Sequence, residues 1–316
     1  MHTIALRSLN PVTLRDVASA PPIDVPAHLT LPPTDIRRKS PAVVISEGLG
    51  GLKASRECSY GQRLAEAGYV TLVPNSFGAR GYGKMPHTWR ALGVTEGHML
   101  ADAFASLAFL ARHPAVDPQR IGIVGFSYGG MTSILTAYRQ LQQLFQPAMG
   151  GDFSFAAHAS YYGCSVPRLD DPTTSGSPVS IFLGERDRNV SVERTRLIAE
   201  DLRKGGSEVD LQVFPGIYHQ WDGDDEAKRF VRFSLGQVRM RVTHANRLID
   251  ESTGIEVTGR LRRAIAIGLS VSIRGYHIQR SQETVQRSDA LLREFFARTL
   301  GAGGELDRPI AAVAGR

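Results

Sequence analysis

The stretch IGIVGFSYGGMTSILTAYRQ, residues 121–140, predicts a buried strand that runs into a helix through one tight turn. Residues 121–125 form a short apolar run typical of a strand covered on both faces, and residues 127–140 have helical periodicity. Between them stands Gly125-Phe126-Ser127-Tyr128-Gly129, a Gly-x-Ser-x-Gly motif. A turn this sharp needs small residues on both sides of the serine and presents the serine hydroxyl at the end of the strand. An ordinary glycine-rich helix start is the alternative, but it does not require the preceding strand.

The segments on both sides of this motif alternate short apolar runs with longer runs of helical period. This alternation predicts an α/β fold, with a mostly parallel central sheet and helices on both faces. The further strands are expected at residues 42–46, 69–74, 179–184 and 209–214. The further helices are expected at residues 58–67, 99–112, 192–204 and 283–300.

The segments that fit this alternation poorly suggest the domain boundaries. Residues 1–40 are expected to be an N-terminal extension with one or two edge strands, and residues 41–300 a single domain. Within that domain, residues 222–280 are irregular and could form a lid, a dimer surface or a structural wrap. Residues 301–316 are rich in Gly and Ala, which predicts a flexible tail.

The composition excludes several classes of protein. The chain has 316 residues, of which 42% are hydrophobic and 22% charged, an ordinary globular balance. No apolar run is long enough to span a bilayer, and the N-terminus lacks a signal-like hydrophobic region, so we expect a cytoplasmic protein with no membrane partner.

The net charge of +6 is concentrated near one end of the chain. Residues 228–316 hold 16 Lys and Arg against 8 Asp and Glu, without any nucleic-acid-binding motif. A solvated basic face is the simpler interpretation, and no nucleic-acid partner is expected. Cys58 and Cys164 stand far apart without zinc-ligand spacing, so they are expected to be buried thiols, and no metal site is predicted.

A serine nucleophile needs a base to take its proton and a third group to orient that base. His219 and Asp187 each follow a predicted parallel strand, at the sheet edge where open α/β sheets place their ligands. Glu185 and Asp222 are rival acids, but Glu185 lies very near its strand end and Asp222 very near the histidine. The sequence therefore predicts a Ser127–His219–Asp187 triad.

An acyl-transfer site also needs hydrogen-bond donors for the developing oxyanion. The backbone N–H of Tyr128 is one, from the geometry of the turn. The other is expected in the glycine-rich turn of residues 46–51, from the N–H of Leu49, with Gly48 as the second choice. A phosphate cradle is excluded there, because neither Gly-Lys-Ser/Thr nor Gly-x-Gly-x-x-Gly occurs.

These residues resemble the α/β hydrolase superfamily and, within it, the dienelactone hydrolase family. The resemblance covers residues 25–299 and rests on PAVVISEGLGG, LAEAGYVTLVPNSFGARG, DPQRIGIVGFSYGGM, the GERD loop, FPGIYH and the late LLREFF helix. It implies that Arg80 could contact a substrate carboxylate and that Glu47 lies beside the nucleophile, either tuning Ser127 or capping a turn. The chain departs from the founding members, which use a cysteine nucleophile and a second arginine after the histidine.

The sequence as a whole predicts a serine hydrolase that cleaves a small carboxylic ester or lactone through an acyl-enzyme. No cofactor is required by this chemistry. The candidate substrate-binding residues are Glu47, Gly48, Arg80, Phe126 and Trp221. The alternatives are a peptidase or an acyltransferase that uses the same triad, and a non-catalytic binding protein that has kept the fold.

Overall fold

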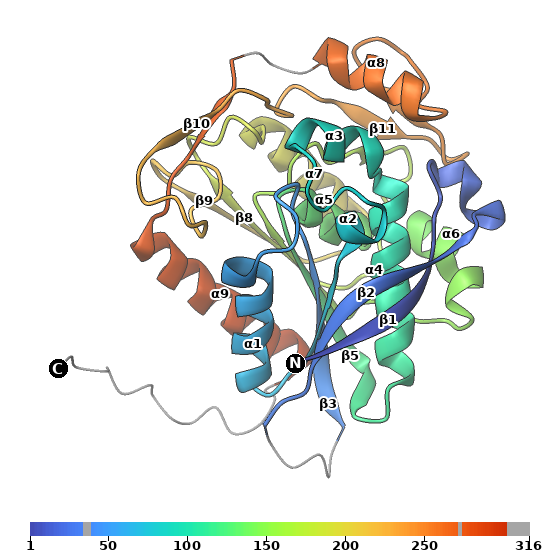
Figure 1. The fold of residues 1–316 in the computed structure, drawn as a ribbon, viewed down its shortest axis with the longest axis vertical. Coiled ribbons are helices and arrows are strands. Elements are labelled where there is room, and N and C mark those ends of the chain that lie inside the picture. Colours follow the sequence, from blue (N-terminus) through green and yellow to red (C-terminus); the bar gives the residue numbers. More distant parts are fainter. Residues whose placement is uncertain (34–38, 271–273, 302–316) are drawn as a thin grey trace.

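The computed structural model describes residues 1–33, 39–270 and 274–301. Its centre is an eight-stranded sheet with strand order β1-β2-β4-β3-β5-β6-β8-β9 (Figure 1). The two antiparallel pairs join β1 to β2 and β2 to β4, and all other neighbours are parallel. The strands are β1 (His2–Leu9), β2 (Pro22–Thr30), β3 (Ser40–Ser46), β4 (Val70–Pro74), β5 (Val116–Phe126), β6 (Ala157–Tyr161), β8 (Val179–Gly184) and β9 (Val209–Phe214).

Helices cover both faces of this sheet, as the sequence predicts. Figure 1 shows α1 (Ser59–Glu66) and α9 (Gln282–Leu300) on one side, with α4 (Glu96–Arg112) and α6 (Arg139–Met149) on the other. The remaining helices are α2 (Ser76–Ala79), α3 (His87–Gly93), α5 (Tyr128–Leu135), α7 (Val192–Lys204) and α8 (Arg260–Ser270), with a 3-10 turn η1 (Leu14–Ser19) and a π turn η2 (Ala54–Cys58).

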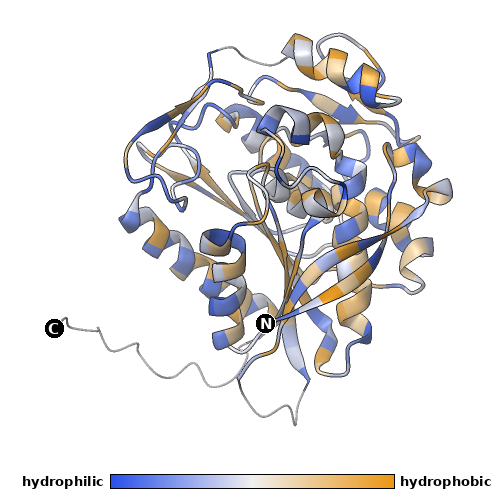
Figure 2. Cartoon of the chain, in the orientation of Figure 1, coloured by the Kyte–Doolittle hydropathy of each residue, from blue (hydrophilic) through white to orange (hydrophobic). Residues whose placement is uncertain are grey.

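The core lies along the inner parallel strands. Every residue of β4, β6 and β8 is buried, and in Figure 2 the centre of the sheet is largely hydrophobic. Parallel strands are covered on both faces, which is why their sequences are continuous apolar runs rather than alternating ones. The sheet therefore gives the loops at its carboxyl edge a rigid support.

One predicted helix is wrong in extent. The helix expected over residues 127–140 is two helices, because α5 ends at Leu135 and α6 begins at Arg139. Tyr138 between them forms an isolated bridge with Thr174, and the Arg139 N–H donates to the Thr173 carbonyl at 3.0 Å. These tertiary hydrogen bonds replace the intrahelical ones that a continuous helix would need.

The N-terminal segment pairs directly with the sheet. Strands β1 and β2 form an antiparallel hairpin in which His2 is opposite Leu29, and β2 also pairs with β4. The hairpin thus supplies two of the eight strands, with β1 at the edge. The end of the predicted extension, residues 34–38, lies outside the described residues.

The described residues of the segment 222–280 lie over the carboxyl edge of the sheet as short elements (Figure 1). Strand β10 (Arg229–Val231) pairs with β13 (Tyr276–Ile278), and β11 (Met240–Val242) lies between β12 (Leu248–Asp250) and β7 (Arg168–Leu169). Helix α8 packs beside α3 (Figure 1). The tail predicted over residues 301–316 lies, apart from Gly301, outside the described residues, and no helix that is described could cross a membrane.

Candidate active site

Ser127 occupies the sharp turn between β5 and α5, with φ 54° and ψ −109°. Such a backbone conformation is strained for a residue with a side chain, and strain of this kind is concentrated at functional sites. The two flanking glycines allow the turn. A Cβ at Gly125 would lie 1.9 Å from the Gly129 carbonyl oxygen, and one at Gly129 would lie 2.1 Å from that of Ser46.

The structure brings the three predicted triad side chains together. The Ser127 Oγ lies 3.1 Å from His219 Nε2, and His219 Nδ1 lies 2.6 Å from Asp187 Oδ2. All three side chains are buried. The serine hydroxyl, the imidazole and the carboxylate thus form one continuous chain of hydrogen bonds, shielded from water.

Backbone amides fix the orientation of the Asp187 carboxylate. Its Oδ1 accepts from the N–H groups of Asn189 at 2.8 Å and Val190 at 3.1 Å, which leaves Oδ2 for His219. A carboxylate held in this way keeps its partner histidine in one tautomer and one ring position. The geometry therefore gives Asp187 the orienting position.

The two rival acids have other partners. Glu185 Oε2 accepts from the Gly216 N–H at 2.8 Å, and Asp222 Oδ1 accepts from the Tyr162 hydroxyl. Among the described contacts only Asp187, of these three acids, bonds the imidazole of His219.

Two tyrosines hold the His219 ring from its sides. The Tyr162 and Tyr276 ring centroids lie 4.8 Å and 5.0 Å from that of the imidazole, both in edge arrangements. The backbone of His219 also forms a bridge with Ile278, at the end of β13. Neither tyrosine was predicted to lie at the site, because its contact with His219 depends on how distant loops pack.

The glycine-rich turn after β3 approaches the nucleophile closely. A Cβ at Gly48 would lie 2.9 Å from the Phe126 carbonyl oxygen and 3.4 Å from the Ser127 Cβ. Glu57 holds this turn, accepting from the Gly48 N–H at 3.4 Å and from the Lys53 N–H at 3.0 Å. Since the Gly48 amide is directed to Glu57, the amide of Leu49 is the better candidate for an oxyanion donor.

A buried ion pair lies behind this turn and was not identified from the sequence. Arg56 donates to Glu57 Oε1 from Nε at 2.9 Å and from Nη2 at 2.6 Å, and both side chains are buried. Asp222 also interacts electrostatically with Arg56 and accepts the Tyr162 hydroxyl. Arg56 in η2 thus interacts, through Asp222, with Tyr162 beside His219. In the sequence, Arg56 and Glu57 look like ordinary solvated charges.

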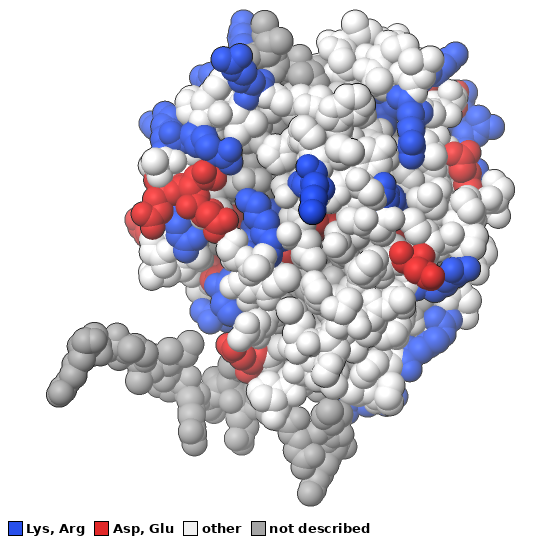
Figure 3. Space-filling model, viewed as in Figure 1, with Lys and Arg blue, Asp and Glu red and all other residues white. Residues whose placement is uncertain are grey.

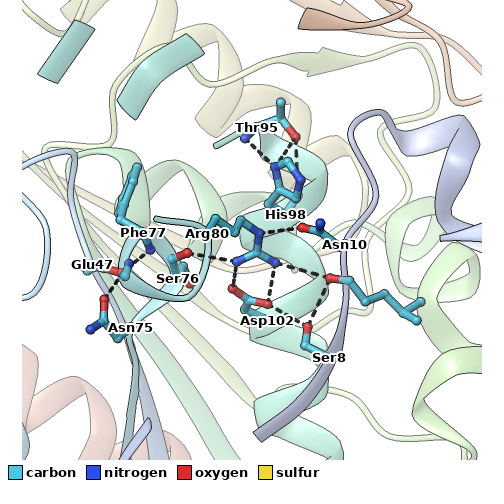
Figure 4. A network of polar contacts seen from close by, with 12 residues as sticks. Ser8, Asn10, Glu47, Asn75, Ser76, Phe77, Arg80, Thr95, His98 and Asp102 are labelled. Atoms are coloured by element: carbon cyan, nitrogen blue, oxygen red, sulfur yellow. Dashed lines mark hydrogen bonds and ion pairs between the residues drawn. The ribbon is translucent and has the colours of Figure 1, made fainter. Parts of the chain in front are cut away.

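Arg80, a candidate substrate contact, lies in a separate network (Figure 4). Its guanidinium donates to both Asp102 oxygens at 2.7 and 3.0 Å, to Asn10 at 2.9 Å, and to the carbonyls of Ser76 and Leu9 at 3.0 and 3.3 Å. A guanidinium has five N–H donors, and these bonds use all of them. The structure therefore assigns Arg80 to joining β1, α2 and α4 and leaves it no donor for a substrate carboxylate.

Glu47 is buried beside the turn but does not contact Ser127. Its Oε1 accepts from the Phe77 N–H at 3.0 Å, at the start of α2, while Oε2 is buried without a partner among the described residues (Figure 4). Burial raises the pKa of this carboxyl from 4.5 to about 8, and the nearby Glu57 contributes to the rise. Of the two roles considered from the sequence, the contacts favour capping.

We expect Glu47→Gln to remove a pH dependence of stability. Between pH 4.5 and 8 the folded protein keeps the Glu47 proton while the unfolded chain releases it, so wild-type stability falls as pH rises. The wild type should lose roughly 1 kcal/mol of unfolding free energy per pH unit relative to Glu47→Gln across this window. Urea unfolding at several pH values measures this, with the exposed Glu66→Gln as control. Parallel pH curves for wild type and Glu47→Gln would contradict it.

The two aromatic candidates lie in the core rather than in an open pocket. Phe126 is buried among Tyr60, Tyr161 and Tyr162. Trp221 is also buried, and its Nε1 donates to the Ser288 Oγ of α9 at 3.2 Å. Their contacts support the strand and loop that carry the triad and show no surface that a substrate could reach.

Both cysteines are free thiols. Cys164 is buried, and its Sγ lies 3.5 Å from the Ser127 Oγ, a position that the sequence did not suggest. Burial raises its pKa to about 11, so it is a neutral thiol at physiological pH. Cys58 is partly exposed. Within the described ranges no group of three or more His, Cys, Asp or Glu side chains is placed to hold a metal ion.

Comparisons with known proteins identify the family of this chain. A model of the dienelactone hydrolase family matches residues 25–243. A Synechocystis protein named "Putative carboxymethylenebutenolidase" is 23% identical over 208 residues, which cover 59% of this chain and 78% of that protein. A Fusarium vanettenii protein named "Probable dipeptidyl-aminopeptidase B" is 28% identical over 175 residues, and the match spans 49% of this chain but only 19% of that longer protein.

A solved structure shares the fold. The crystal structure of a protein named "Putative Dienelactone Hydrolase" from Klebsiella pneumoniae superposes with a TM-score of 0.52 at 20% sequence identity. The superposition covers 70% of this chain and 89% of that one. At such identity the likeness concerns the architecture, and the chemistry has to be argued from the residues of this chain.

Proposed function

The chain belongs to the dienelactone hydrolase family of α/β hydrolases, and on this basis we propose that it hydrolyses a carboxylic ester or lactone of a small molecule through a Ser127 acyl-enzyme. The observation that carries the proposal is the hydrogen-bonded chain from Ser127 Oγ through His219 to Asp187, with distances of 3.1 and 2.6 Å. This chain supplies the base and the orienting carboxylate that a serine nucleophile requires.

The first half-reaction forms the acyl-enzyme. Ser127 Oγ attacks the ester carbonyl carbon while its proton moves to His219 Nε2, and the Asp187 carboxylate stabilises the resulting imidazolium. The tetrahedral intermediate collapses when the carbon–oxygen bond to the leaving alcohol breaks, and His219 returns the proton to that alcohol. In the second half-reaction, water attacks the acyl carbonyl while its proton moves to His219 Nε2. The bond from the carbonyl carbon to Ser127 Oγ then breaks, and His219 returns the proton to Oγ, which releases the acid.

Two backbone amides are proposed to hold the oxyanion. The Tyr128 N–H begins α5 directly after the nucleophile, and the Leu49 N–H belongs to the turn that approaches Ser127. Donors built into the backbone are rigid, so they stabilise developing charge without first having to reorganise. Their position is supported by the Arg56–Glu57 pair, which anchors this turn through Gly48 and Lys53.

The structure offers more support for a neutral substrate than for an anionic one. All five donors of Arg80 are engaged with protein groups, and the segment after His219 reads QWDGDDE, without a basic residue. A carboxylate near Ser127 would thus lack the paired arginines that the founding family members use. The proposed substrate class is an uncharged short ester or lactone.

A peptidase or acyltransferase is the alternative on the same triad, and the relative named as a dipeptidyl-aminopeptidase keeps it open. We expect the purified protein to hydrolyse p-nitrophenyl acetate and butyrate at least about 10³-fold faster, in kcat/KM, than matched p-nitroanilides of the same acyl groups. Absorbance at the p-nitrophenolate and p-nitroaniline bands measures both. Anilide turnover equal to ester turnover would favour the peptidase, and inertness toward both would favour a binding protein.

A further inference from the structure

Five of the eight large apolar side chains that are exposed among the described residues belong to α8 or to the segment in and before α3, which packs beside it. In α8, Leu261, Ile265 and Leu269 are 76%, 44% and 66% exposed. Met85, just before α3, is 48% exposed, and Trp89, within α3, is 61% exposed. We call these five side chains the α3–α8 face. Single exposed apolar residues are common, but several on two helices that pack against each other are typical of an interaction site.

The three residues of α8 form a regular stripe. Leu261, Ile265 and Leu269 are four residues apart, so they lie along one side of the helix. The opposite side is buried through Arg263, Ala266 and Ile267. One side of the helix therefore packs on the protein, and the opposite side exposes an apolar stripe to solvent.

A buried network ties this helix to the candidate site. Arg263 pairs with Glu96 at 2.6 and 3.0 Å, donates to the Ala91 carbonyl of α3 at 2.9 Å, and donates to the Tyr128 hydroxyl at 2.8 Å. Tyr128 directly follows the proposed nucleophile. The α3–α8 face is thus held rigidly at the side of the molecule where Ser127 lies, and its exposure does not come from a loosely attached helix.

The charges around the face are positive. Arg260 and Arg262 lie at the start of the stripe and Lys84 precedes Met85; all three are exposed, and none has a carboxylate partner among the described residues. In Figure 3 the surface over α8 is largely uncharged, and the largest group of acidic side chains lies at the left of the view, away from it. Apolar and aromatic side chains bordered by unpaired cations are typical of a helix that lies on an anionic lipid surface.

From this juxtaposition we propose that the α3–α8 face docks on an anionic lipid surface, with Leu261, Ile265, Leu269, Met85 and Trp89 entering the interface and the neighbouring cations contacting the headgroups. The sequence-based expectation of no membrane partner rested on the lack of a spanning segment, which a surface-lying helix does not need. Docking does not depend on the proposed reaction, so the two can fail separately.

The charge pattern argues against a second copy of the chain as the occupant. A two-fold interface places the same patch of both copies together, so it would gather the cations Arg260, Arg262 and Lys84 of both copies without adding a carboxylate to pair with them. Nearby acidic side chains are already paired, Glu251 with Arg194 and Glu256 with Arg15. A lipid layer rich in phosphate groups neutralises the cations, whereas a second copy would oppose them.

The test uses the full chain with vesicles of phosphatidylcholine alone or of equal parts phosphatidylcholine and phosphatidylglycerol. Binding is measured by vesicle flotation and by quenching of tryptophan fluorescence with brominated lipid. The chain has only two tryptophans, and Trp221 is buried, so quenching reports on Trp89. We expect flotation and quenching with the anionic vesicles and little of either with phosphatidylcholine alone.

Variants separate the two components of the face. The triple variant Leu261→Ser/Ile265→Ser/Leu269→Ser should weaken partitioning at least about tenfold, because it removes apolar burial. The double variant Arg260→Glu/Arg262→Glu should weaken partitioning by at least about as much, because it removes the attraction to anionic headgroups. Leu197→Ser, at another exposed apolar position on α7, should bind as the wild type does. Circular dichroism checks that each variant is folded.

Three results would overturn the proposal. The first is no binding to either kind of vesicle. The second is equal binding to both, which would remove the role of the anionic headgroups. The third is a concentration-dependent dimer in light scattering that the triple serine variant abolishes, which would assign the face to a second copy. Ester hydrolysis is assayed separately with soluble substrates, so a failure of docking leaves the proposed reaction standing.

Discussion

Ser127→Ala is expected to lower kcat for p-nitrophenyl ester hydrolysis by about 10⁴ to 10⁶. The Oγ is the proposed nucleophile, and without it His219 can act only as a base toward water. The alanine keeps the backbone turn that Gly125 and Gly129 permit, so the fold should be retained. Steady-state kinetics measures the loss, and mass spectrometry after fluorophosphonate treatment locates the label.

Cys164→Ala is the matched control, because its thiol lies 3.5 Å from the same hydroxyl and the founding family members use a cysteine nucleophile. As a buried thiol with a raised pKa, it should not attack the substrate, so this variant should stay within about tenfold of the wild type. A label on Cys164, or full activity in Ser127→Ala, would refute the assignment of the nucleophile.

Asp187→Asn should lower kcat by about 10³ to 10⁴ while KM changes little. The N–H groups of Asn189 and Val190 require an acceptor at the Oδ1 position, so the new amide must turn its NH₂ toward His219 Nδ1. The imidazole then carries its proton on Nε2 and donates to Ser127 instead of accepting from it. The number of hydrogen bonds is unchanged, but His219 can no longer accept the proton of the Ser127 hydroxyl.

Glu185→Gln is the comparison for this change, since Glu185 belongs to the same loop and bonds the Gly216 amide rather than the histidine. It should leave kcat within about threefold of the wild type. Kinetics of both variants, with crystal structures to show the histidine orientation, decide between the acids. A larger loss in Glu185→Gln than in Asp187→Asn would give the orienting role to Glu185.

Most of the strands that the sequence predicts, such as β3 and β8, have apolar side chains on both faces, whereas β9 is predicted from the alternation in VDLQVF. Strand β6 was missed because His158 and Ser160 interrupt its apolar run, although both are buried. The imidazole of His158 lies 3.1 Å from the Thr136 hydroxyl, beyond the end of α5. A polar residue whose partner comes from a distant helix cannot be recognised as buried from its own segment, which is also why the helix break before Arg139 was not foreseen.

In the candidate site, too, the residues whose role is set by their own segment are predictable, and those whose role is set by distant partners are not. Ser127 is predictable because the constraint on its turn is local and is met by glycines two residues away on each side. Arg80 is different, because its role is set by Asp102 and by backbone carbonyls of β1 and α2, none of which the motif contains. Trp221 likewise follows a motif histidine but packs in the core through α9. Local geometry can be read from sequence, whereas the partner of a long side chain depends on the completed fold.

The support behind His219 sets an order of assembly during synthesis. His219 leaves the ribosome 92 residues after Ser127, and the groups that brace its loop, Ile278 and Ser288, come later still. Until α9 packs, the nascent chain can hold a formed sheet and nucleophile turn while its histidine loop lacks a fixed position. In the proposed mechanism the proton path therefore depends on contacts that the chain can make only after β13 and α9 have been synthesised, so activity would report that these two elements have packed.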